Sequence, residues 1–305
     1  MGIIDWMADK VQGITGEKER RQLVQKLKEK YHEFKSNVEK KILEINVLIE
    51  KFNNIIQQLN NIRTTKVENH ILILNKFLSR FGKIKSIGDY SPELELPPAN
   101  LPNKEFEKIE SYIHEVDWSR EDVFINTFFL SPIGMTIKTK KQNLSLNERI
   151  AEFQLMAEET LKELRIRALG QTNDNTVAQL YYDCVNFIVD TIDQKIIPEL
   201  TLVQQFFQAE EITDHILAGS DNKELRSIIN ISMLNNTQYQ KHYNFIKNAF
   251  SFYIISCKIY NTPILTHLIQ GKCTPEDKEQ LLLEQKTLQE QENQLSNSMV
   301  LTIGR

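Results

Sequence analysis

The chain has 305 residues, of which 41% are apolar, 26% charged and 9% aromatic. That composition excludes collagen-like, mucin-like and disulfide-scaffold proteins, and it is too apolar for a wholly disordered chain. The 37 basic and 41 acidic residues give a net charge of −4, without the basic excess of a typical nucleic-acid-binding protein, so no nucleic acid is expected as a partner.

Turn-forming residues are scarce, with 10 glycines and 8 prolines in the whole chain. Sheets and barrels need a tight turn every dozen residues or so, and this supply of turn formers is too small for them. The composition therefore predicts an all-α fold, and the long helical patterns described below predict an elongated helical bundle.

Residues 1–16 form an amphipathic segment. Its apolar side chains predict a short helix that packs on the protein itself, on a partner or in a membrane interface. The residues of this segment that we predict at a membrane are Ile3, Ile4, Trp6, Met7 and Val11. Charged residues interrupt the apolar run that a secretory signal needs, and the three cysteines are far apart in the sequence. We therefore expect a cytoplasmic chain, with peripheral attachment to a membrane as an additional hypothesis.

Residues 17–87 carry a heptad-like apolar seam. Apolar side chains recur in steps of three and four from Val24 to Leu59 and again from Val67 to Phe81, a pattern typical of a coiled coil. This spacing predicts one very long helix, or a helical hairpin if residues 63–66 form a turn. Because large apolar stripes are rarely left open to water, we predict that the seam binds a second copy or another helical protein. The predicted interface residues are Val24, Leu27, Phe34, Val38, Ile45, Phe52 and Leu59, with Leu281, Leu288 and Leu295 from the C-terminal segment.

Residues 88–103 contain four prolines, which predicts an extended connector between the long helix and a helical body over residues 104–305. Asn103 is placed to cap a helix that carries Phe106, Ile109, Ile113 and Val116.

Residues 123–137 lack any charge and are interrupted by Pro132 and Gly134. The segment is too short and too broken to span a membrane as a helix. It fits either a loop that plugs the core or a membrane-inserting hairpin, whose membrane residues would be Phe124, Phe128, Phe129, Leu130, Ile133 and Met135.

The rest of the body reads as further helices. A capping box at residues 145–148 opens a helix that we expect to stop at Gly170, and Pro198 is expected to kink or restart the next one. Thr274 and Pro275, followed by two acidic residues, form a strong helix start signal.

No motif in the sequence indicates catalysis. Glu29 and His32 are half of a di-iron pattern whose second half is missing, and Asp183, Asp190 and Asp193 share a helix face that is explained as simply by contact with water. We therefore expect a non-enzymatic protein with no catalytic site, metal, cofactor or small-molecule substrate.

The leading functional hypothesis is a helical scaffold or assembly subunit. The alternative, from a different class, is an α-helical pore-forming or membrane-permeabilising protein that uses residues 123–137. This alternative rests on an analogy of architecture with pore-forming toxins and on no shared motif.

Overall fold

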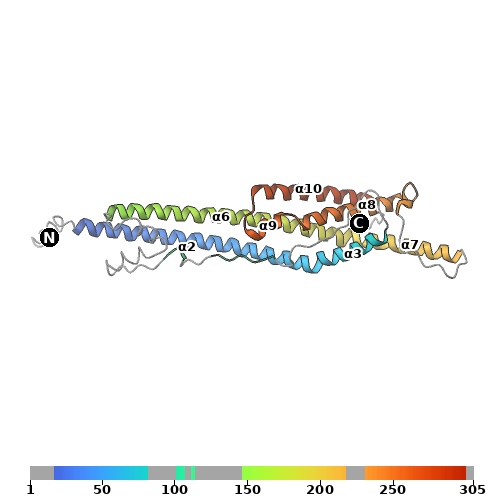
Figure 1. Cartoon of the computed structure of the whole chain (residues 1–305), viewed down its shortest axis with the longest axis horizontal. Helices are drawn as coiled ribbons and strands as arrows, with labels where there is room; N and C mark the ends of the chain where they lie inside the picture. Colours follow the sequence, from blue (N-terminus) through green and yellow to red (C-terminus); the bar gives the residue numbers. More distant parts are fainter. Residues whose placement is uncertain (1–16, 82–100, 107–110, 114–145, 218–230, 300–305) are drawn as a thin grey trace, which may run out of the picture. The chain divides into compact units, whose positions relative to one another are not determined.

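Figure 1 shows the computed structural model of the chain, which describes residues 17–81, 101–106, 111–113, 146–217 and 231–299. All regular elements in these ranges are helical and none is a strand, which confirms the all-α prediction. The α-helices are α2 (Glu17–Ile62), α3 (Glu68–Arg80), α6 (Leu146–Thr191), α7 (Ile197–Leu217), α8 (Gln240–Tyr260), α9 (Ile264–Gln270) and α10 (Pro275–Ser298), with a short 3₁₀ helix at Ile231–Leu234.

The N-terminal seam forms one continuous helix. A π turn of five residues, Arg63–Val67, joins α2 directly to α3, and the residues that flank it keep right-handed helical backbone angles. The hairpin alternative is therefore wrong, and residues 63–66 mark a change of helical pitch within a single helix.

The second long helix is built in the same way. A π turn at Ile192–Ile196 joins α6 to α7. The expected stop at Gly170 is wrong, because α6 continues through this residue to Thr191. Gly170 is exposed, whereas Gln171 and Val177 beyond it are buried, so packing of the continuing helix outweighs the weak helix propensity of glycine.

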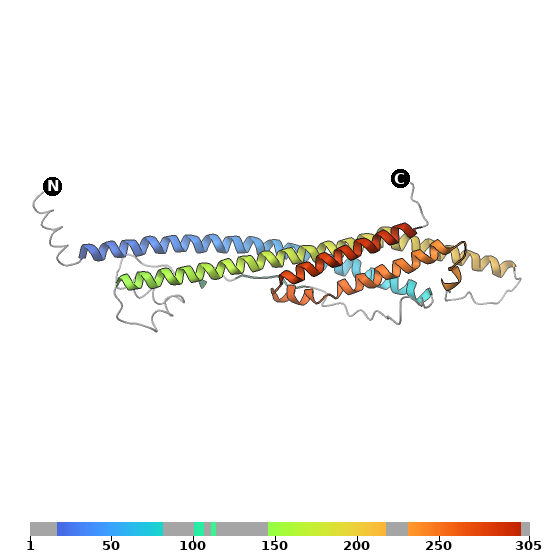
Figure 2. The ribbon, with the colours of Figure 1, turned by 90° about the horizontal axis from the view of Figure 1, so that it is seen from above.

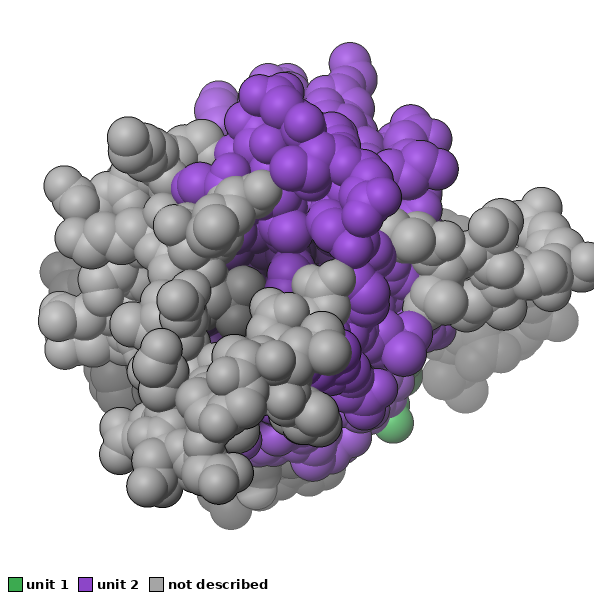
Figure 3. All heavy atoms as spheres, turned by 90° about the vertical axis from the view of Figure 1, so that its right-hand side faces the viewer, with its two compact units in different colours: residues 1–51, 104–172 green, residues 52–103, 173–305 purple. Residues whose placement is uncertain are grey.

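The chain divides into two compact units, which Figure 3 colours separately. Unit 1 comprises residues 1–51 and 104–172, and unit 2 comprises residues 52–103 and 173–305. Each unit thus combines residues from both sides of the predicted connector.

In unit 1, α2 and α6 lie side by side and run in the same direction (Figures 1 and 2). Their apolar seams face each other, and the rings of Phe34 and Phe153 meet edge to face with centroids 5.7 Å apart. Residues 101–106 are not helical, Ser111 has 3₁₀ geometry, and the rest of the helix expected after Asn103 lies outside the described residues. Tyr112 accepts a 2.9 Å hydrogen bond from Arg167 of α6 and stacks on Phe106.

Unit 2 is a bundle in which α10 lies along α8 (Figures 1 and 2). Leu281, Leu288 and Leu295 fall on one side of α10 at seven-residue intervals, and all three are fully buried. The predicted start of α10 is confirmed: the Thr274 hydroxyl accepts a hydrogen bond from the Asp277 amide, and the Asp277 carboxylate accepts one from the Thr274 amide.

Among the helices described, none has an apolar stretch of the length needed to cross a bilayer.

Candidate functional site

The feature of unit 2 that departs most from a regular bundle is the pair of π turns. In the first long helix, Leu59, Arg63, Val67 and Ile71 are buried at three successive steps of four residues. In the second, Ile188, Ile192, Ile196 and Leu200 repeat this pattern. An α-helix has about 3.6 residues per turn, so repeated steps of four drift around it, and a π turn, which takes in one more residue, returns the side chains to the core.

The second π turn has a local cause in the sequence. Pro198 has no amide hydrogen and its ring crowds the carbonyl one turn earlier, which favours a wider turn over Ile192–Ile196. In the first helix, the hydroxyls of Thr64 and Thr65 donate to the carbonyls of Asn60 and Asn61 at 2.9 and 2.6 Å. These hydroxyls satisfy carbonyls at the entrance to the wider turn.

Asp193, in the second π turn, joins the two helices. Its Oδ2 lies 2.8 Å from Nζ of Lys66 in the first π turn, and its Oδ1 lies 2.7 Å from Nε2 of His70 in α3. His70 is only 1% exposed, and among the described residues its Nδ1 has no hydrogen-bond partner. Asp193 accepts from Nε2–H, so the hydrogen bond fixes the orientation of the imidazole ring.

These contacts determine the charge of Asp193. Burial acts to raise the pKa of Asp193, but the hydrogen bonds with Lys66 and His70 outweigh it and hold that pKa below its usual value. The same pairing raises the pKa of the Lys66 amine. Asp193 and Lys66 therefore form an ion pair at neutral pH, against a buried histidine.

The second π turn also holds α10. Lys195 forms an ion pair with Glu292 and donates a 2.9 Å hydrogen bond to the Ser296 hydroxyl. Burial acts to raise the pKa of Glu292, but Lys195 and Ser296 together lower it. Asp193 and Lys195, two residues apart, thus connect one π turn to α3 and to α10.

A buried polar layer continues into the bundle beside the π turns. Arg63 is 4% exposed and acts electrostatically on Tyr181, whose hydroxyl donates to the Tyr260 carbonyl at 3.4 Å. Burial raises the pKa of both tyrosines, and the positive charge of Arg63 opposes the increase at Tyr181. Both phenols are therefore neutral at physiological pH.

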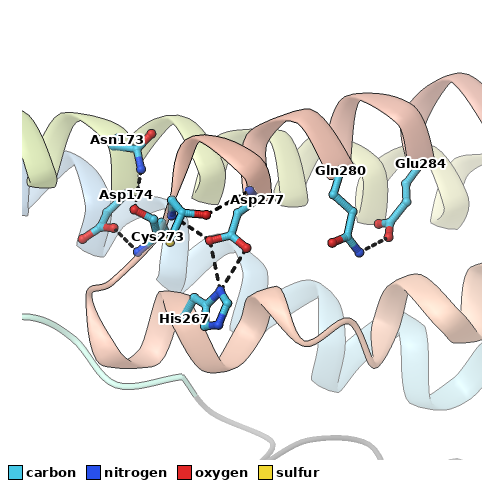
Figure 4. A network of polar contacts seen from close by, with 8 residues as sticks. Asn173, Asp174, His267, Cys273, Asp277, Gln280 and Glu284 are labelled. Atoms are coloured by element: carbon cyan, nitrogen blue, oxygen red, sulfur yellow. Dashed lines mark hydrogen bonds and ion pairs between the residues drawn. The ribbon is translucent and has the colours of Figure 1, made fainter.

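A second polar network closes the corner between α9 and α10 (Figure 4). Nδ1 of His267 lies 2.9 and 3.0 Å from the carboxylate oxygens of Asp277. From α6, Asn173 donates to the Cys273 carbonyl at 2.6 Å, and Asp174 accepts from the Cys273 amide at 3.1 Å. These bonds anchor the loop before α10 to α6, and they join α9 to the first turn of α10.

The chemistry of both networks is that of joints between helices. Asp193, Lys195 and Asp277 each pair with a charged or titratable side chain of these networks, and no cluster of three metal-ligating side chains occurs in the described parts of the chain. The three aspartates predicted to share a helix face each bind different partners. Asp183 accepts from Gln179, Asp190 accepts from Asn186, and Asp193 binds Lys66 and His70.

The structure places the predicted interface residues in the chain's own core. Leu27, Phe34, Val38 and Ile45 are buried in unit 1, while Phe52, Leu59, Leu281, Leu288 and Leu295 are buried in unit 2, and Val24 is half-buried. The seam is thus covered by helices of the same chain. The predicted membrane residues, in the segments 1–16 and 123–137, lie outside the described residues.

The predicted site residues did not include Arg63, His70, Lys195 or Glu292, and Asp193 was considered only as one of three aspartates on a shared helix face. The sequence signal for this site is a charged residue, Arg63, at a position of the apolar seam. Two further seam positions, Val67 and Ile71, follow it at intervals of four residues. A pattern of this kind predicts a widened turn at a polar layer, and π turns often occur at functional sites.

Comparison of the chain with protein-family models, curated protein sequences and solved structures finds no match.

Proposed function

We propose that the chain is a non-enzymatic helical scaffold that assembles with further copies of itself through the outer faces of unit 1. The observation that carries this proposal is a set of exposed aliphatic side chains on α6. Leu155, Ile166 and Leu169 are 59%, 60% and 71% exposed. Their spacing amounts to about three and four full turns, so they share one face of the helix.

That face is opposite the buried seam of α6, to which Leu164 and Ala168 belong. Helix α2 has the same arrangement, with Leu43 and Val47 one turn apart and 66% and 64% exposed. Single exposed aliphatic residues are common, but aligned ones on both helices of a pair are typical of surfaces that receive another helix. The contacts of the π turns support the same function, because they hold the long helices in a fixed register.

The test is the mass of the protein in solution. We expect sedimentation equilibrium to give a mass above the 35.7 kDa of one chain for the unaltered protein, and the double substitution Ile166→Glu, Leu169→Glu to return the mass to that of one chain. Leu283→Glu is the matched control, because Leu283 is 66% exposed on α10 in unit 2. A mass of one chain at hundreds of micromolar for the unaltered protein would refute self-assembly.

A membrane-permeabilising function is the second candidate, and it rests on the uncharged run over residues 123–137. If this run inserts, the protein releases dye from loaded liposomes and Phe129→Glu abolishes the release while circular dichroism stays unchanged. Full release by this variant would exclude the run as the inserting segment, and intact liposomes with the unaltered protein would exclude the function.

A further inference from the structure

The two π turns contact each other, although they lie far apart in the sequence. Lys66 belongs to the first π turn and Asp193 to the second, and their charged atoms are 2.8 Å apart. His70, one turn beyond Lys66, binds the other oxygen of the same carboxylate. One aspartate thus contacts both the first π turn and the helix that follows it.

Neither turn can revert to an α turn alone without a large loss of packing. A π turn holds one more residue than an α turn, and one residue corresponds to a rotation of about 100°. Loss of the first π turn would rotate α3 against α2 and move Ile71 and Leu74 away from the core, where both are now buried. Loss of the second would do the same to Ile196 and Leu200.

The two turns differ in what maintains them. Pro198 lacks the amide hydrogen that an uninterrupted α-helix needs, so the covalent structure favours the second turn. The first turn contains no proline, and its hydroxyl bonds to Asn60 and Asn61 are also available to threonines in an ordinary α-helix. The first turn therefore depends on its partners from the second helix.

We infer that the two π turns form a single coupled conformational element, in which the turn fixed by Pro198 maintains the other through Asp193. Loss of the link through Asp193 therefore weakens the first turn, although its own sequence is unchanged. This dependence of one helix on a proline in the other goes beyond a static scaffold.

Hydrogen exchange of the amides of Arg63–Val67 in the full-length chain tests the inference. Pro198→Ala permits a regular α turn in the second helix, and Asp193→Asn removes the ionic link at nearly constant shape. We expect each substitution to accelerate exchange in the first π turn at least about tenfold, whereas the matched control Asp183→Asn, a half-buried aspartate of α6 that accepts from Gln179, leaves it unchanged.

Coupling also predicts that the double variant Asp193→Asn, Pro198→Ala exchanges no faster at Arg63–Val67 than the more affected single variant, because both act on one link. Asp193→Glu, which keeps the carboxylate, should restore part of the protection. The inference is overturned if Pro198→Ala changes exchange around Ile192–Ile196 and leaves Arg63–Val67 within twofold of the unaltered protein. It is also overturned if the two substitutions act additively, or if exchange in α10 accelerates as much as exchange in the first π turn.

Discussion

Substitution of Gly170 by alanine distinguishes the continuous helix of the structure from the helix stop that the sequence suggests. In the structure, Gly170 lies inside α6, and a methyl group added there meets no atom within 4 Å. Alanine therefore adds no steric clash, and it lowers the entropy that the backbone loses on folding. We expect Gly170→Ala to increase the free energy of unfolding by about 1 kcal/mol.

Gly271 provides the opposite case in the same protein. It ends α9 with φ of 64°, in the left-handed region, where its amide bonds back to the last turn of the helix. A side chain in this conformation costs about 1–2 kcal/mol, so Gly271→Ala should decrease the free energy of unfolding by that amount.

The measurements are urea unfolding followed by circular dichroism and amide exchange near each glycine. A gain of about 1 kcal/mol corresponds to roughly fivefold slower exchange around Gly170 if the segment opens locally. A loss of stability in Gly170→Ala, similar to that in Gly271→Ala, would mean that Gly170 is a left-handed helix end, and the continuous α6 would be refuted.

Three further predictions follow from burial and charge. Leu288→Ala should lower the free energy of unfolding in urea by about 2–5 kcal/mol, because the Leu288 side chain is fully buried. Leu283→Ala on the same helix should lower it by less than about 0.5 kcal/mol, because Leu283 is exposed. Equal effects would contradict the packing of α10. The pKa of Asp277 is lowered from 3.8, so the contribution of this carboxylate to stability is complete above that pH and is lost as the pH falls through the folded pKa. The free energy of unfolding of Asp277→Asn should therefore depend less on pH between about 5 and 2 than that of the unaltered protein. An unchanged slope would argue against this contribution. Cys273 is half-buried, whereas burial raises the pKa of the Cys184 and Cys257 thiols to about 12. Iodoacetamide at neutral pH should therefore modify Cys273 first. Equal labelling of all three cysteines before unfolding would contradict the burial of Cys184 and Cys257.

The periodic apolar seam shows how far sequence reasoning reaches in this protein. Steps of three and four from Leu27 to Leu59 indicate a buried stripe, and every predicted seam residue from Leu27 onward in this stretch is buried. The pattern predicts that the stripe is covered, but it does not indicate whether a helix of the same chain or a helix of another molecule covers it. In the structure, α6 and other segments of this chain cover it, through contacts between residues far apart in the sequence, such as Phe34 and Phe153.

Local signals fix helix ends only where nothing distant opposes them. The cap formed by Thr274, Pro275 and Asp277 satisfies amides at the start of α10 within four residues, and the structure has it as predicted. The signal at Gly170 is worth about 1 kcal/mol, less than the burial of the helix beyond it, so the helix continues. Pro198 is intermediate: its effect on the backbone is local, but the π turn before it also matches the packing of Ile192 and Ile196.

The sequence by itself therefore determined the all-α fold, the buried stripes and the start of α10, because each depends on residues within a few turns of one another. Only the tertiary structure decided which helices cover the stripes, that both long helices widen at π turns in contact with each other, and that Asp193 binds Lys66 and His70. The contacts of Asp193 join segments separated by more than 120 positions. A helical pattern fixes which side of a helix is buried but leaves its partner undetermined.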